Sequence, residues 1–107
     1  MKRKSVDLRR AAQSDIDEAI DFYVAQTAHD VAHRFIDEVE RALDHLSRHP
    51  ESGSPRYALE LGLPGLRHWP VAGYPYLVFY HDRSERIDVW RVLHGERDIP
   101  AWLRAVD

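Results

Sequence analysis

The apolar residues of this chain change their spacing once, and that change limits the folds that the chain can adopt. Between residues 16 and 46 they recur every three or four positions, which is the period of an amphipathic α-helix. The first stripe consists of Ile16, Ala19, Ile20, Tyr23 and Val24, and the second of Ala32, Phe35, Ile36, Val39, Ala42, Leu43 and Leu46. Helix-start signals precede them, Ser14 with Asp17 and Thr27 with Asp30. The first half is therefore predicted to be a helical hairpin.

Beyond residue 65 the pattern is that of short strands separated by turns. Residues 66–69 form a candidate strand, and residues 76–81, a continuous apolar and aromatic run, are predicted to form a central one. Residues 87–94 follow as the third strand of a meander. Residues 4–8 are short and partly β-branched, which indicates an edge strand.

The segment between the two halves and the end of the chain are less regular. Residues 50–65 contain three prolines and three glycines, and a short element is predicted inside them, at residues 57–63. A short final helix is predicted after Asp98, which can cap it, with Pro100 in its first turn. Its apolar side would consist of Trp102, Leu103 and Val106.

The predicted fold class is α+β, in the order β-α-α-β-β-β-α. A small antiparallel sheet of about four strands would carry the helical hairpin on one face, because neither layer can bury its apolar side alone. Residues 1–107 are predicted to form a single domain, as expected for a chain of this length. The final helix would cover the opposite face only in part, so a shallow cleft on that face is the expected functional surface.

The composition excludes several classes of protein. No apolar run is long enough for a membrane span or a signal-peptide core, and there is no cysteine, which together favour a cytoplasmic protein. Residues 1–13 carry five basic residues and one acidic residue, whereas residues 14–51 carry three basic and ten acidic residues. Because the net charge is −3, the chain is not expected to grip nucleic acid through phosphates or to bind a specific sequence directly.

Three motifs occur in an order typical of a known superfamily. They are "HPESGSPR" after the hairpin, "GLRHWPVAGYPYLVFYH" over the first two strands of the meander, and "IDVWRVLHGERD" over the third. Together they resemble the RelE/ParE superfamily, the toxins of type II toxin–antitoxin modules, and the ParE branch in particular. The resemblance spans nearly the whole chain and implies a ParD-like antitoxin as partner. It also implies one of two activities: RelE-like members cut messenger RNA on the ribosome, whereas ParE-like members bind DNA gyrase and stall it on DNA.

The residues favour binding over catalysis. Cleavage of RNA by its 2′-hydroxyl needs a base, an acid and cations around the phosphate. The arginine that the superfamily places at the start of the central strand is replaced here by Pro75-Tyr76, and no tyrosine follows Tyr80. Every lysine lies within residues 2–4. We therefore expect a toxin that inhibits gyrase by binding, with no catalytic residue and no cofactor.

Two alternatives to that interpretation stay open. A RelE-like, ribosome-dependent endoribonuclease could be assembled from Arg67, His68, His81, Arg91, His94 and Arg97. The chain could also be an inactive homologue that keeps only antitoxin binding. For Arg91 a structural role is favoured, in which its head pairs with a carboxylate such as Glu96 or Asp98. Strand alternation would place Arg91 on one face with Ile87, Val89 and Leu93.

Two histidine pairs have the spacing of metal ligands on one helix face. They are His29 with His33 and His45 with His49. No glutamate follows the first histidine of either pair, as the metalloprotease motif requires, and no third ligand is evident. No metal site is therefore expected.

Exposed tryptophan and arginine are common anchors of protein interfaces. The candidate target-binding residues are Arg67, Trp69, Arg91, His94, Arg97 and Trp102. The resemblance points to the region from Arg97 onward for action on gyrase and to the helical hairpin for the antitoxin. The candidate antitoxin-binding residues are Phe22, Tyr23 and Phe35, and the acidic helix faces suggest that the antitoxin contributes lysine or arginine.

Overall fold

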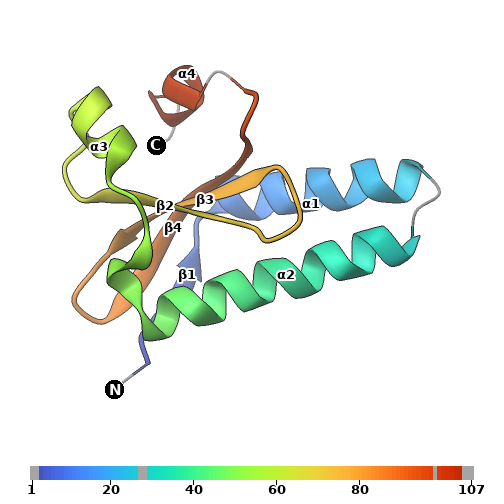
Figure 1. Ribbon diagram of the computed structural model, residues 1–107, viewed down its shortest axis with the longest axis horizontal. Helices are drawn as coiled ribbons and strands as arrows, with labels where there is room; N and C mark the ends of the chain where they lie inside the picture. The colour runs from blue at the N-terminus through green and yellow to red at the C-terminus, as the bar shows by residue number, and fades with distance from the viewer. Residues whose placement is uncertain (1–2, 27–28, 98, 105–107) are drawn as a thin grey trace.

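The computed structural model describes residues 3–26, 29–97 and 99–104 (Figure 1). The elements in chain order are β1 (Ser5–Leu8), α1 (Arg10–Ala25), α2 (His29–Arg48), the 3₁₀ turn η1 (Pro50–Ser52), α3 (Arg56–Leu61), β2 (Leu66–Pro70), β3 (Tyr76–Asp82), β4 (Arg86–His94) and α4 (Ile99–Arg104). This confirms the predicted α+β order, and α3 is the short element expected within the loop. None of the helices in these ranges combines the length and the hydrophobicity that a membrane span requires.

The four strands form one sheet in the order β1-β4-β3-β2. The meander β2-β3-β4 is antiparallel as predicted, but β1 runs parallel to β4, so the sheet is mixed. The sequence pattern reveals an edge strand but not its direction, because β1 is separated from its partner by both helices. The hairpin of α1 and α2 covers one face of the sheet, and α3 and α4 lie on the other side (Figure 1).

The larger core lies between the hairpin and the sheet. Its fully buried side chains include Phe35, Leu46, Val78, Tyr80 and Val89. Four aromatic rings in and beside this core pack against one another, with ring centroids 5.2–5.5 Å apart. The four rings belong to Tyr23, Phe35, Tyr74 and Tyr76. The predicted helical stripes therefore form the buried sides of α1 and α2, except for Val24, which is exposed.

The first helix begins earlier than the sequence signals indicate. It starts at Arg10, so Ser14 lies exposed inside the helix and does not cap it. The Arg9 N–H donates to the Val89 carbonyl at 3.0 Å, and the chain turns into the helix directly from β1. Because Ala12 is fully buried in the core, tertiary packing outweighs the local capping preference. Thr27 lies outside the described residues, and α2 begins at His29.

A β-bulge in β4 reverses the predicted faces of that strand. Phe79 pairs with Arg91 but Tyr80 pairs with Val89, so Trp90 is the extra residue. Val89 and Val92 consequently share the core on the hairpin side, and Leu93 packs in the core on the other side. The predicted alternation, with Arg91 on the same face as Val89, is therefore wrong beyond Trp90.

The "HPESGSPR" segment is fixed by side chains of the meander. The Tyr80 hydroxyl donates to the Pro50 carbonyl at 2.7 Å and accepts the Gly53 N–H at 2.9 Å. A Cβ on Gly53 would lie only 2.4 Å from that hydroxyl, which explains the glycine. Arg67 Nη1 donates to the carbonyls of Gly53 and Glu51, at 2.7 Å and 3.2 Å.

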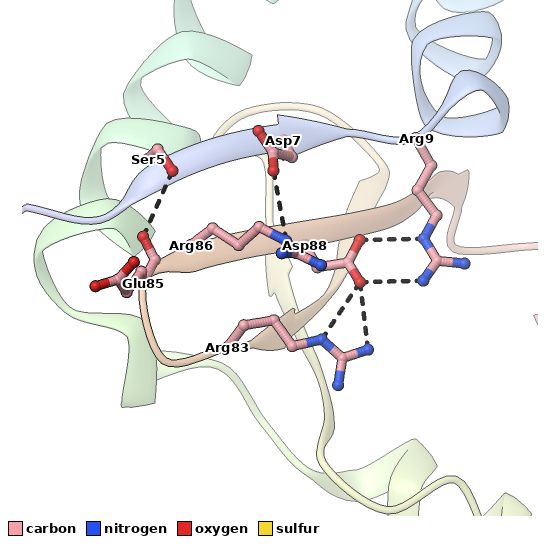
Figure 2. A network of polar contacts seen from close by, with 7 residues as sticks. All are labelled: Ser5, Asp7, Arg9, Arg83, Glu85, Arg86 and Asp88. Atoms are coloured by element: carbon pink, nitrogen blue, oxygen red, sulfur yellow. Dashed lines mark hydrogen bonds and ion pairs between the residues drawn. The ribbon is translucent and has the colours of Figure 1, made fainter.

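Ion pairs join β4 to the β1 side and to the β3–β4 turn (Figure 2). The buried carboxylate of Asp88 accepts from Arg9 at 3.0–3.1 Å and from Arg83 at 3.3–3.4 Å. Burial alone would raise the pKa of Asp88, but the hydrogen bonds and charges of the two arginines outweigh it and hold the pKa below its ordinary value.

Basic residues of the first 13 positions pair with acids elsewhere in the fold. Arg3 pairs with Asp44 and Lys4 with Asp82, as Arg9 does with Asp88. The positive N-terminal segment thus attaches β1 to α2 and to the β3–β4 turn.

Candidate functional site

A cleft of about 360 Å³ lies where α1, the end of β4 and α4 meet. Its lining residues are Asp15, Glu18, Ala19 and Phe22 from α1, Tyr76 from β3, Val92, Leu93 and His94 from β4, and Arg97 and Trp102 beyond it. This cleft does not lie on the face opposite the hairpin, where a functional surface was expected. That face is covered by α3 and α4, and the cleft opens instead between α1 and α4, where β1 has ended and no longer pairs with β4.

The inner wall of the cleft is a buried ion pair between α1 and β4. Arg91 Nε and Nη2 donate to the two oxygens of Asp15 at 2.7 Å each, and both side chains are less than a tenth exposed. Asp15 also accepts the Val92 N–H at 2.9 Å. The hydrogen bonds that Arg91 donates to Asp15 raise the pKa of Arg91 and more than offset the effect of its burial. One carboxylate therefore accepts hydrogen bonds from the Arg91 guanidinium and from a backbone N–H of β4.

The outer wall of the cleft is formed by Trp102, which is 38% exposed. The guanidinium carbon of Arg97 lies 4.6 Å from the centre of the indole ring, and that of Arg91 lies 5.0 Å from it. These distances are within the range of cation–π attraction. Ile99 and Leu103 of the same helix are buried against Leu66, Phe79 and Leu93, so α4 has one side in the core and its tryptophan at the surface.

The end of the cleft holds a tyrosine and a histidine. The rings of Tyr76 and His94 meet edge to face at 5.3 Å, and His94 Nδ1 accepts the Glu96 N–H at 3.1 Å. Burial is the main cause that raises the pKa of Tyr76; Arg97 opposes it, while Glu18 and Asp15 add to it. The Tyr76 hydroxyl therefore stays protonated at neutral pH and can donate a hydrogen bond.

The six candidate target-binding residues fall into two places. His94, Arg97 and Trp102 line the cleft, and Arg91 lies in its inner wall. The carboxylate that Arg91 contacts is Asp15, so the expected pairing with Glu96 is wrong, and Asp98 lies outside the described residues. Arg67 and Trp69 lie apart on β2, where Arg67 fixes the η1 turn and Trp69 stacks on His45 with ring centres 4.5 Å apart.

The three candidate antitoxin-binding residues differ in exposure. Phe22 is 55% exposed at the rim of the cleft, and Tyr23 is half-buried against it with ring centres 5.4 Å apart. Phe35 is fully enclosed in the core, so its side chain cannot contact a partner in this structure.

Sequence reasoning missed Asp15, Glu18 and Tyr76. A signal for Asp15 was present, because this carboxylate stands between Ala12 and Ala19 at the spacing of the buried stripe of α1. A charged residue at such a position is rarely buried without a partner.

The remaining histidines do not join the cleft. His68 and His81 lie on the face beneath α3 and beside Trp90, and burial lowers the pKa of both rings. His45 shares a hydrogen bond of 2.9 Å with Ser52. Across residues 3–26, 29–97 and 99–104, no three His, Cys, Asp or Glu side chains gather in a way that could hold a metal ion.

The fold and the cleft can now be compared with known proteins. The model of one family, described as the ParE toxin of the type II toxin–antitoxin system parDE, matches residues 6–99. The chain belongs to the ParE toxin family. A solved structure described as the chromosomal ParDE toxin–antitoxin system from P. aeruginosa contains a chain that is 20% identical, with a TM-score of 0.71. The match covers 86% of this chain and 96% of that one, and it confirms the ParE-like fold. No curated protein matches in sequence.

Proposed function

We propose that this ParE-family toxin inhibits DNA gyrase by binding it through the cleft between α1 and α4, and that a ParD-like antitoxin neutralises it. The observation that carries the proposal is the character of the cleft. Trp102 and Arg97, two residue types that dominate binding energy at protein interfaces, stand together at its outer wall. Gyrase acts in the cytoplasm, so the proposal places the toxin there.

The charges in the cleft support a protein target over an RNA strand. The Arg91 guanidinium is buried and neutralised by Asp15, so it is not free to hold a phosphate. Glu18 adds a further carboxylate to the lining, which repels a phosphate backbone at close range. A polypeptide that presents an apolar side chain beside a basic residue suits such a lining better than a polyanion does.

The antitoxin surface is proposed to be the outer side of α1. Within the described part of the chain, Asp17, Glu18 and Asp21 of α1 form no ion pair. On α2, Asp30 and Asp44 pair with arginines, whereas Asp37 does not. Glu18 lines the cleft together with the exposed ring of Phe22, and Asp21 directly precedes that residue in the helix. A basic, amphipathic segment of the antitoxin would cover both the charges and the ring.

The target is tested with purified toxin and purified gyrase. We expect supercoiling to be inhibited and gyrase–DNA cleavage complexes to accumulate in proportion to toxin concentration. In parallel, a cell-free translation reaction should proceed without new 5′ ends in its messages. Cut transcripts together with unaffected supercoiling would replace the proposal by the RelE-like alternative. Inactivity in both assays combined with antitoxin binding would support the inactive homologue.

The antitoxin surface is tested by titrating a ParD-like antitoxin against the double variant Glu18→Lys/Asp21→Lys and against Phe22→Ala. Each should weaken binding at least about tenfold, and the affinity of the wild type should fall as salt is raised. Asp37→Asn, which removes one exposed carboxylate from α2, serves as the matched control. Equal affinities for all four proteins would exclude this surface.

A further inference from the structure

The last helix described, α4, is short. It has six residues, too few for a helix to be stable by itself, and Ile99 and Leu103 are its side chains buried in the core. The residues that lead into it, Gly95 to Arg97, are exposed. Its position therefore depends on the contacts that Ile99, Leu103 and Trp102 make with the rest of the domain.

Arg91 is the residue of β4 that contacts the exposed tryptophan of this helix. Besides its two bonds to Asp15, it donates from Nη1 to the Trp102 carbonyl at 3.5 Å, and its guanidinium lies 5.0 Å from the indole ring centre. The Trp102 carbonyl is one of the last four of the helix, which have no acceptor role inside it, so a cation there stabilises the helix end. Arg91 thus contacts both the indole ring and the backbone of the residue that forms the outer wall.

Asp15 fixes the direction of that guanidinium. Two bonds of 2.7 Å in the planar, bidentate geometry leave Arg91 little freedom to rotate. The Val92 N–H holds the same carboxylate at 2.9 Å, so the carboxylate is itself fixed to the strand. A chain of contacts therefore runs from α1 through β4 to α4.

We propose that Asp15 is a positioning residue for the target-binding tail: through Arg91 it sets where Trp102 stands, without touching the target itself. The inference rests on the proposed function of the cleft. It changes the role of Arg91 as well, because an arginine that is only 7% exposed acts on a partner through Trp102 and not by direct contact. Breaking the chain of contacts at Asp15 should release α4 while the rest of the domain stays folded.

The experiment combines local hydrogen exchange with gyrase inhibition in Asp15→Asn and Arg91→Lys, with Asp37→Asn as the control. Asp15→Asn keeps the shape but removes the charge. Arg91→Lys keeps a cation beside Asp15 but cannot hold Asp15 and Trp102 together. The amides of Leu103 and Arg104, whose N–H groups can reach carbonyls within α4, should exchange at least about tenfold faster in both variants. This increase should exceed what the loss of global stability, measured by urea unfolding of the same variants, accounts for. The toxin concentration for half-inhibition of gyrase should rise at least about fivefold, and the control should match the wild type.

Three outcomes would overturn the inference. If potency falls with unchanged exchange in α4, Asp15 and Arg91 act by contact. If α4 is released and potency stays the same, its position does not matter. If the faster exchange in α4 is fully accounted for by the loss of global stability, the ion pair only stabilises the whole domain. Arg91→Lys decides the question if Asp15→Asn does not fold. A wild type that leaves gyrase unaffected would refute the proposed function alone, because exchange still reports whether Asp15 positions α4.

Discussion

The strand β4 carries two arginine–carboxylate centres, one in each half, and they are built in opposite ways. In the first half the carboxylate of Asp88 is buried on the strand, and Arg9 and Arg83 approach it from other elements with side chains 33% and 43% exposed. In the second half the strand supplies the cation, Arg91, and both it and Asp15 are buried. The first centre joins an edge strand to the sheet, whereas the second stands between the core and a surface tryptophan. We therefore expect Asp88 to contribute to stability alone, whereas the pair of Arg91 and Asp15 contributes to stability and, under the proposed function, also to target binding.

The largest effect on stability is expected from Arg91→Ala. It leaves the Asp15 carboxylate buried without its cation, which typically costs about 3–5 kcal/mol. Urea unfolding monitored by circular dichroism measures the loss, with Asp37→Asn as a surface control. A loss of unfolding free energy below about 1 kcal/mol would mean that water replaces the guanidinium beside Asp15. The Arg91 centre would then stabilise the fold no more than the Asp88 centre does.

A smaller effect is expected from Asp88→Asn. Hydrogen bonds to charged partners contribute about 1.5–3 kcal/mol, and both arginines can return to water because they are partly exposed. Among folded molecules, gyrase inhibition should equal that of the wild type. A variant that folds normally but inhibits weakly would contradict the separation of roles.

The pH dependence of the Asp88 centre has a definite sign. The pKa of Asp88 is lower in the folded chain than in the unfolded one, so its contribution is complete above the unfolded value, about 4, and is lost as the pH falls through the folded value. The difference in unfolding free energy between wild type and Asp88→Asn should therefore be constant from pH 7 to about pH 5 and should shrink below pH 4. A difference that stays constant down to pH 2 would exclude this linkage.

The smallest stability change is expected when both members of the buried pair are replaced by apolar residues, as in Asp15→Leu/Arg91→Met. Such replacements are often neutral in themselves, and the Val92 N–H left without its acceptor costs about 1–3 kcal/mol. The double variant should be more stable than Arg91→Ala and yet remain a weak inhibitor. Recovery of both stability and inhibition would show that apolar packing alone can hold the tail.

Much of the fold could be predicted from the sequence, because the helical stripes and the strands of the meander are visible as local patterns and tertiary packing does not change them. The exceptions have long-range causes. The early start of α1 depends on the bond from Arg9 to Val89, and the reversed faces of β4 depend on a bulge at Trp90, which no local pattern indicates.

The site was predicted less completely than the fold. His94, Arg97 and Trp102 are close in sequence as well as in space, so the C-terminal part of the cleft was found. The part supplied by α1 was missed because Asp15 lies 76 residues away from Arg91. Arg67 and Trp69 were grouped with the cleft by residue type alone, and the structure places them on another strand, β2.

The most direct test of the account is gyrase inhibition by Trp102→Ala, compared with the wild type at equal folded concentration. If the cleft docks gyrase through this indole, inhibition should weaken at least about tenfold, equivalent to about 1.4 kcal/mol of binding, while circular dichroism stays unchanged. Undiminished inhibition by this variant would contradict the account.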